Sequence, residues 1–319
     1  MSSLDAKPAR RWWLAAACVL LIAACQRDPQ VVDGAATEPV AAMHKLARHL
    51  EQGDLVGFAH AAVPPAQREQ LARAWADGDS LWPLTGLPLD EHLPDLLAAL
   101  AAPDAASELR RAHRTQFVGQ GTTLRQTAQA LGLFGSQYVQ HQGQYSSEQR
   151  EHYRQLVLAL SQWAALAGLD DPQRAGPAID QLTAAVGASG LDGRRALAGA
   201  GMEPALERLT PVQQALFEVL AGYGLDLRQS LGGLQARLLS EDGDEALLQV
   251  QYPLAGQQIQ FKARMRRVDG RWYMAQNLAD AAQALASAGQ ARQARLEQPP
   301  APADGGAGGG AHAVPAAGP

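Results

Sequence analysis

Cysteine and lysine are both scarce in this sequence of 319 residues. Cys18 and Cys25 are the only cysteines, too few for the disulfide framework that stabilises many small exported proteins. Lysine occurs at three positions, and the net charge of −5 is spread along the chain without a basic stripe. Nucleic acid is therefore not expected as a partner.

The apolar run near the N-terminus is short. It extends from Trp12 to Ala24, thirteen residues, and follows Arg10 and Arg11. Crossing the hydrocarbon core of a bilayer takes roughly 20 apolar residues, so a transmembrane helix is excluded for this run. A positive segment, an apolar run and small residues in this order are typical of a secretory signal peptide.

Ile22-Ala23-Ala24-Cys25 closes the run and resembles the lipobox of bacterial lipoproteins. The resemblance implies that residues 1–24 are a signal peptide cleaved between Ala24 and Cys25, and that Cys25 carries acyl chains that attach the protein to a membrane. An ordinary cleaved signal peptide is the alternative. In the lipoprotein family, aspartate after the cysteine causes retention at the inner membrane. Gln26 thus implies the outer membrane of a Gram-negative cell, facing the periplasm, where an envelope protein is a candidate partner.

The mature chain divides into four segments by composition. Residues 25–37 are predicted to be a lipidated polar tether, residues 38–231 a helical region, and residues 232–288 an antiparallel sheet with a final helix from Leu278 to Ser287. Residues 289–319, rich in Ala, Gly and Pro, are expected to be disordered because they lack apolar periodicity. The predicted fold class is α+β: a mostly helical N-terminal region, a four-stranded antiparallel meander and a short final helix. Deletion from Arg292 onward is expected to leave the melting temperature nearly unchanged.

Three helix N-termini are predicted from capping residues. Ser146 with Gln149 fits a capping box, and Asp171-Pro172 combines a capping side chain with a first-turn proline. Thr210-Pro211 followed by Gln213 repeats the second pattern.

Alternation of apolar and polar residues predicts the strands of the sheet. Ile259, Phe261 and the odd-numbered positions up to Met265 are apolar, whereas the even positions are polar, so Phe261 is expected to pack against a helix. Hairpin turns are predicted at Asp242-Gly243, within Pro253–Gly256 and at Asp269-Gly270. A two-residue turn at Asp269-Gly270 pairs Met265 with Met274 and Arg267 with Trp272, and brings the Arg267 side chain over the indole ring.

Val268-Asp269-Gly270-Arg271-Trp272-Tyr273 resembles the last hairpin of NTF2-like domains found in some lipoproteins. In that family a curved sheet and helices enclose a pocket. The resemblance implies a ligand or partner surface, for which Phe261, Trp272, Tyr252 and Arg267 are the candidates.

The remaining patterns predict no catalytic, cofactor-binding or metal-binding residue. The eight histidines lack the paired spacing of zinc ligands and are interpreted as solvated or edge residues. Two functions stay open. The first is a non-catalytic binding or scaffolding module in the envelope, and the alternative is a small-ligand-binding or enzymatic NTF2-like domain with an unrecognised pocket.

Replacement of Cys25 tests the lipidation. Cys25→Ala is expected to abolish incorporation of labelled fatty acid and to leave an unprocessed or soluble form, because the thiol that accepts the lipid is gone. Cys18→Ala is the control and should leave labelling intact, since the apolar run before it is too short for a signal peptide. Persistent acylation of Cys25→Ala in the membrane fraction would contradict the interpretation.

Overall fold

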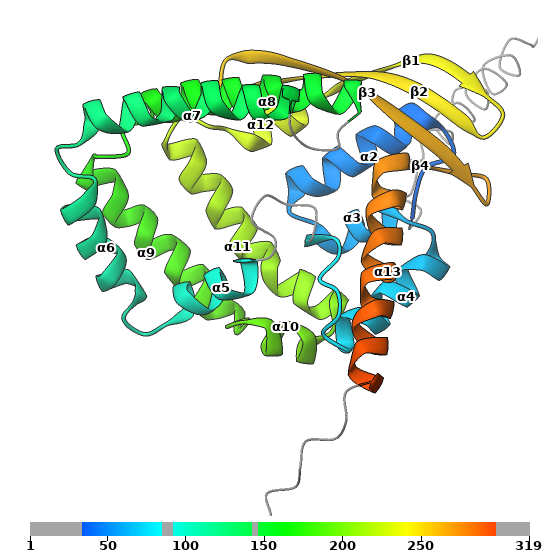
Figure 1. Ribbon diagram of the computed structural model, residues 1–319, viewed down its shortest axis with the longest axis horizontal. Helices are drawn as coiled ribbons and strands as arrows, with labels where there is room; N and C mark the ends of the chain where they lie inside the picture. The colour runs from blue at the N-terminus through cyan, green and yellow to red at the C-terminus, as the bar shows by residue number, and fades with distance from the viewer. Residues whose placement is uncertain (1–33, 85–91, 142–145, 298–319) are drawn as a thin grey trace, which may run out of the picture.

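The computed structural model describes residues 34–84, 92–141 and 146–297, which form an α+β fold (Figure 1). Helices precede a four-stranded antiparallel sheet and one more helix follows it, which confirms the predicted fold class. The helices before the sheet are α2 (Pro39–Gln52), α3 (Leu55–Ala62), α4 (Pro65–Ala76), α5 (Leu93–Ala101), α6 (Ala105–Gln116), α7 (Gly121–His141), α8 (Ser147–Leu166), α9 (Pro172–Ser189), α10 (Arg194–Ala200), α11 (Met202–Gly222) and α12 (Leu227–Gly232). They are followed by β1 (Gln235–Asp242), β2 (Glu245–Leu254), β3 (Gln257–Val268), β4 (Arg271–Met274) and α13 (Ala275–Glu297).

The strands are connected as a meander in the order β1-β2-β3-β4. Ala255-Gly256 and Asp269-Gly270 make the second and third turns, with φ of 51° and 76° in one and 51° and 74° in the other. Positive φ at both positions suits the right-handed twist of the flanking strands. The first turn is Gly243-Asp244, one residue later than predicted.

The predicted register at the last hairpin is confirmed. Met265 pairs with Met274 and Arg267 with Trp272. The Arg267 guanidinium carbon lies 5.3 Å from the centre of the Trp272 ring. This stacking joins the end of β3 to β4 on one face of the sheet.

One face of the sheet is covered by helices. Ile259, Ala263 and Met265 are buried, whereas the even-numbered residues between them are exposed, as the alternation predicts. Phe261 lies on the same side, is half-buried, and stacks on His152 of α8. Met43 of α2 packs against the buried side chains of β2, β3 and β4. The helical region therefore packs directly on the sheet.

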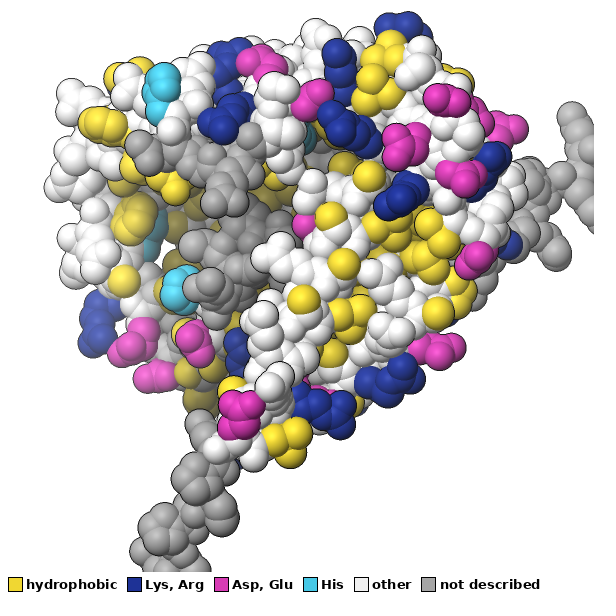
Figure 2. Space-filling view, turned by 45° about the vertical axis from the view of Figure 1, so that its right-hand side comes forward, with side chains coloured by type: hydrophobic (Ala, Val, Ile, Leu, Met, Phe, Trp, Pro, Cys, Tyr) yellow, Lys and Arg dark blue, Asp and Glu magenta, His cyan; other side chains and the backbone are white. Residues whose placement is uncertain are grey.

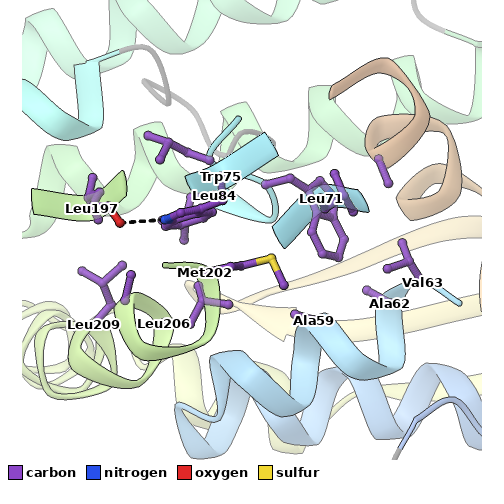
Figure 3. Packing of buried hydrophobic residues seen from close by; sticks show 14 of the residues in the cluster. Ala59, Ala62, Val63, Leu71, Trp75, Leu84, Leu197, Met202, Leu206 and Leu209 are labelled. Carbon is purple, nitrogen blue, oxygen red and sulfur yellow. Dashed lines mark hydrogen bonds between the residues drawn. The ribbon is translucent and has the colours of Figure 1, made fainter. Parts of the chain in front are cut away.

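A larger core lies away from the sheet, around Trp75 of α4. The Trp75 indole is fully buried, and its Nε1–H donates to the carbonyl oxygen of Leu197 at 2.8 Å. Met202 and Leu206 of α11 belong to the same core, and Figure 3 shows these side chains converging around the indole. The hydrogen bond satisfies the one polar atom that this large ring buries.

The final helix is longer than predicted. Instead of Leu278–Ser287, α13 extends over Ala275–Glu297, so residues 289–297 of the predicted disordered segment are helical. Ala, Gln, Arg and Leu dominate this stretch and are good helix formers. Ala281 and Ala288 are buried, and the helix packs against α4. The rest of the segment, 298–319, lies outside the described residues.

Thr210-Pro211 does not begin a helix. Both residues lie inside α11, so the predicted N-terminus is wrong, whereas those at Ser146 and Asp171 are confirmed by side-chain caps. Leu206 and Leu209 before Pro211 and Val212 after it pack in the core around Trp75. This packing outweighs the hydrogen bond that proline cannot make.

The last residues of the predicted tether are attached to the body. Ala35 is 1% exposed. Its carbonyl oxygen accepts from the guanidinium Nη1 of Arg271 at 2.6 Å. The carbonyl oxygen of Ala36 accepts from the main-chain N–H of Trp272 at 2.9 Å. The side chain of Lys45 also donates to the carbonyl oxygen of Gly34. The prediction of a tether that extends to residue 37 is therefore wrong for residues 34–36, because these residues hydrogen-bond to β4 and to Lys45 of α2.

The structure reverses the expectation for a truncation at Arg292. Arg295 pairs with Asp79, whose side chain is only 5% exposed. Deletion of residues 292–319 is expected to lower the melting temperature, because it leaves this carboxylate without its cation. Arg295→Ala should reproduce the loss in calorimetry, and Arg292→Ala, at an exposed position of the same helix, should not. Equal melting temperatures for Arg295→Ala and the unmodified protein would contradict this assignment.

Candidate functional site

Helix α8 covers an edge of the sheet that no strand covers. β4 pairs only with Met265–Val268, so the remainder of β3 has no strand partner on that side among the described residues. The side chain of Gln155 fills the role of a strand there. Its Oε1 accepts from the Gln260 N–H at 2.9 Å, and its Nε2 donates to the Gln260 carbonyl oxygen at 3.2 Å. This pair of bonds satisfies main-chain groups that would otherwise remain open for pairing with another chain.

A pocket of about 370 Å³ lies where α8 begins. It is bounded by α8, by β3 and by the junction of β4 with α13. Gln149 bridges two of these walls, because its Nε2 donates to Oε1 of Gln276 at 2.8 Å. The lining residues are Ser146, Glu148, Gln149, His152, Tyr153, Phe261, Lys262, Ala263, Arg264, Met274, Ala275 and Gln276.

Three rings meet at the inner end of this pocket. His152 stacks on Phe261 with ring centres 4.3 Å apart, and its Nε2 lies 2.9 Å from the Tyr252 hydroxyl oxygen. Tyr252 in turn meets Phe261 edge-on at 6.3 Å. Burial lowers the pKa of His152 to about 4 and raises the pKa of Tyr252. Both groups are therefore neutral at pH 7, and the inner end of the pocket carries no charge.

The outer end of the pocket is charged. Lys262 and Arg264 project from the exposed face of β3, and Glu148 lies in the first turn of α8. Hydrogen bonds with its own backbone N–H and with Ser147 and Ser146 lower the pKa of Glu148, so its carboxylate is engaged at the helix start. Figure 2 shows side chains of both charge signs interspersed over the upper part of the molecule, where Figure 1 places the sheet and α8.

The structure separates the residues predicted as a ligand or partner surface into two places. Phe261 and Tyr252 meet beside the pocket. Trp272 is only 1% exposed and belongs to the core between the sheet and α2. Arg267 holds the first hairpin turn, where it donates to Asp244 and to the Gly243 carbonyl oxygen, each at 2.9 Å.

Ala24 and Cys25 lie outside the described residues. The cleavage and lipidation expected there therefore stay predictions. Among the described residues, no helix combines the length and apolarity needed to cross a membrane.

The interpretation of the histidines as solvated or edge residues assigns no role to His152, which is half-buried against Phe261 beside the open edge of the sheet. A usable signal was the spacing of Glu148, His152, Gln155, Ala159 and Gln162, which recur every three or four residues and so share one helix face. All five contact or face β3 and the adjoining β2: Ala159 packs with Ile259, and Gln162 accepts from Gln257 at 2.9 Å. In the described part of the chain, no group of three His, Cys, Asp or Glu side chains is placed to hold a metal ion.

Comparison with known proteins found no relative of this chain. No family model, no curated protein and no solved structure matches this chain.

The neutral His152 predicts a pH dependence of stability. Its pKa is about 4 in the folded protein and near 6.5 when unfolded, so the unfolded state binds more protons between these values. The neutral His152 therefore makes its full contribution to the free energy of unfolding above pH 6.5. This contribution is lost as the pH falls towards 4. His152→Phe, which keeps a ring on Phe261, is expected to flatten the dependence of the urea midpoint on pH between 7 and 5.

The exposed His141 provides the control for this measurement. His141→Gln should retain the dependence of the unmodified protein. An unchanged pH dependence in His152→Phe would show that other groups cause it.

Proposed function

We propose that this chain is a lipid-anchored cell-envelope protein that acts as a non-catalytic binding or scaffolding module at the outer membrane, facing the periplasm. The lipobox-like Ile22-Ala23-Ala24-Cys25 supports the anchor. The binding role is supported by one structural observation, an exposed apolar flank on α7.

This α7 flank consists of Leu131, Phe134 and Tyr138, whose exposed fractions are 65%, 66% and 57%. Their spacing places them on one side of the helix. Arg125 is the only Lys, Arg, Asp or Glu in α7. Protein interfaces are enriched in aromatic residues and depleted of charge at their centre, which is the composition of the α7 flank.

The side of α7 next to the flank holds it in place. Gly132 and Gly135 face α8 so closely that an added Cβ would lie 2.2 Å from the Ser161 hydroxyl oxygen and 2.9 Å from a Val157 methyl. Close approach of the two helices lets α8, itself attached to β3, support α7. A rigidly held apolar surface suits docking of a partner, because little conformational entropy is lost on binding.

The second candidate is a small-ligand-binding or enzymatic domain of the NTF2-like kind. It is favoured by the pocket at the start of α8, which a neutral histidine and several polar side chains line, with the Tyr252 hydroxyl hydrogen-bonded to that histidine beside the pocket.

Site-specific crosslinking in cells tests the scaffolding role. A photoreactive residue at Phe134 is expected to form an adduct with an envelope protein. Leu296, 81% exposed near the end of α13, provides the control position and should form none. Leu131→Asp should remove the Phe134 adduct without lowering the melting temperature, because it places a charge in the surface without disturbing the core. Adducts equal at both positions, or insensitive to Leu131→Asp, would contradict the proposal.

A further inference from the structure

We infer that the pocket at the start of α8 binds a small carboxylic acid with an apolar body, the body lying towards Phe261 and the carboxylate at Lys262 and Arg264. This inference rests on the ligand-binding candidate above, and it is independent of lipidation and of the α7 flank.

The inner wall of the pocket favours an apolar group. Phe261 and Met274 are both half-buried, although the residues beside them on the same face, Ala263 and Met265, are almost fully covered. Both side chains line the pocket, so part of Phe261 and part of Met274 remain in contact with water there. An apolar ligand body would displace this water, which is the main favourable term in such binding.

The cations at the outer end favour an anion. Among the described residues, the Lys262 ammonium makes no ion pair, and the Arg264 side chain is 72% exposed. The nearest contact between Arg264 and Glu148 is 3.6 Å, which leaves the N–H donors of the guanidinium available. The N-terminal turn of α8, whose residues Ser146, Glu148 and Gln149 line the pocket, adds the positive potential of a helix N-terminus.

The charges also give the ligand one orientation. Glu148 is the one acidic side chain among the residues that line the pocket, and hydrogen bonds with its own backbone N–H, Ser147 and Ser146 engage its carboxylate at the helix start. His152 is neutral, so no cation lies at the inner end to attract the carboxylate. The apolar body faces inward and the carboxylate outward, where water can complete its hydrogen bonds.

Three probes separate the apolar from the anionic contribution. Octanoate combines both, 1-octanol is apolar only, and acetate is anionic only. The protein labelled at its methionine ε-methyl groups is titrated with each probe and followed by NMR. Octanoate is expected to shift the Met274 methyl saturably and not that of Met202, which lies in the Trp75 core. Octanol should bind about tenfold more weakly, because it lacks the charged hydrogen bonds, and acetate should cause no saturable shift.

Two variants test the cations. Lys262→Gln combined with Arg264→Gln is expected to weaken octanoate binding to the level of octanol and to leave octanol binding unchanged. Arg266→Gln is the matched control, since Arg266 is exposed on the same face of β3 but does not line this pocket.

Several results would overturn the inference: octanol binding as tightly as octanoate, an equal loss in Arg266→Gln, or a shift of Met202 without Met274. Because both substitutions are at exposed positions, unfolding does not obscure the result. Failure of the Cys25 and Phe134 experiments would leave these titrations unaffected, so the two sets of outcomes remain distinguishable.

Discussion

The open edge of β3 is the constraint on which the arrangement of this molecule depends. β3 has twelve residues and β4 only four, so most of one β3 edge lacks a neighbouring strand. Unpaired main-chain groups at such an edge are costly when buried and promote aggregation when exposed. The Gln155 amide accepts one hydrogen bond from Gln260 and donates one to it, as a neighbouring strand would. Together with Ala159 on Ile259 and the hydrogen bond from Gln257 to Gln162, this contact fixes α8 along β3, and α7 packs against α8.

The pocket is a consequence of the same arrangement. A straight helix follows a twisted strand closely only over part of its length. Around Gln155 the fit is close, but towards Ser146 a space remains beside the strand, and there Gln149 of α8 donates to Gln276 of α13. His152 lies between these regions. Its burial against Phe261 removes its charge, so the contact that holds the helix also makes the inner end of the pocket neutral.

The sheet could be predicted from the sequence because its determinants are local. Asp269-Gly270 and the alternation around Ile259 specify turns and faces between residues that are neighbours along the chain. The contact of Gln155 with Gln260 joins residues 105 positions apart, and no local pattern encodes it. The wrong prediction of a helix start at Thr210-Pro211 has the same cause, because α11 is maintained by core contacts with residues distant along the chain. Residues 289–297 are helical although the composition of the whole C-terminal segment predicts disorder, because this part consists mostly of good helix formers.

The hydrogen bonds of Ala35 and Ala36 to β4 alter what the proposed lipid anchor would do. With the chain fixed from residue 34, only residues 26–33 separate Cys25 from the body. Eight residues at about 3.3 Å each reach about 26 Å, whereas a free tether up to residue 37 would reach about 40 Å. Attachment at the β4 edge would keep the sheet near the bilayer, while α13 leads away from the sheet towards the opposite side of the molecule (Figure 1). A short link and a fixed attachment point restrict the orientations available to the body, and this restriction is what a scaffold at a membrane surface requires.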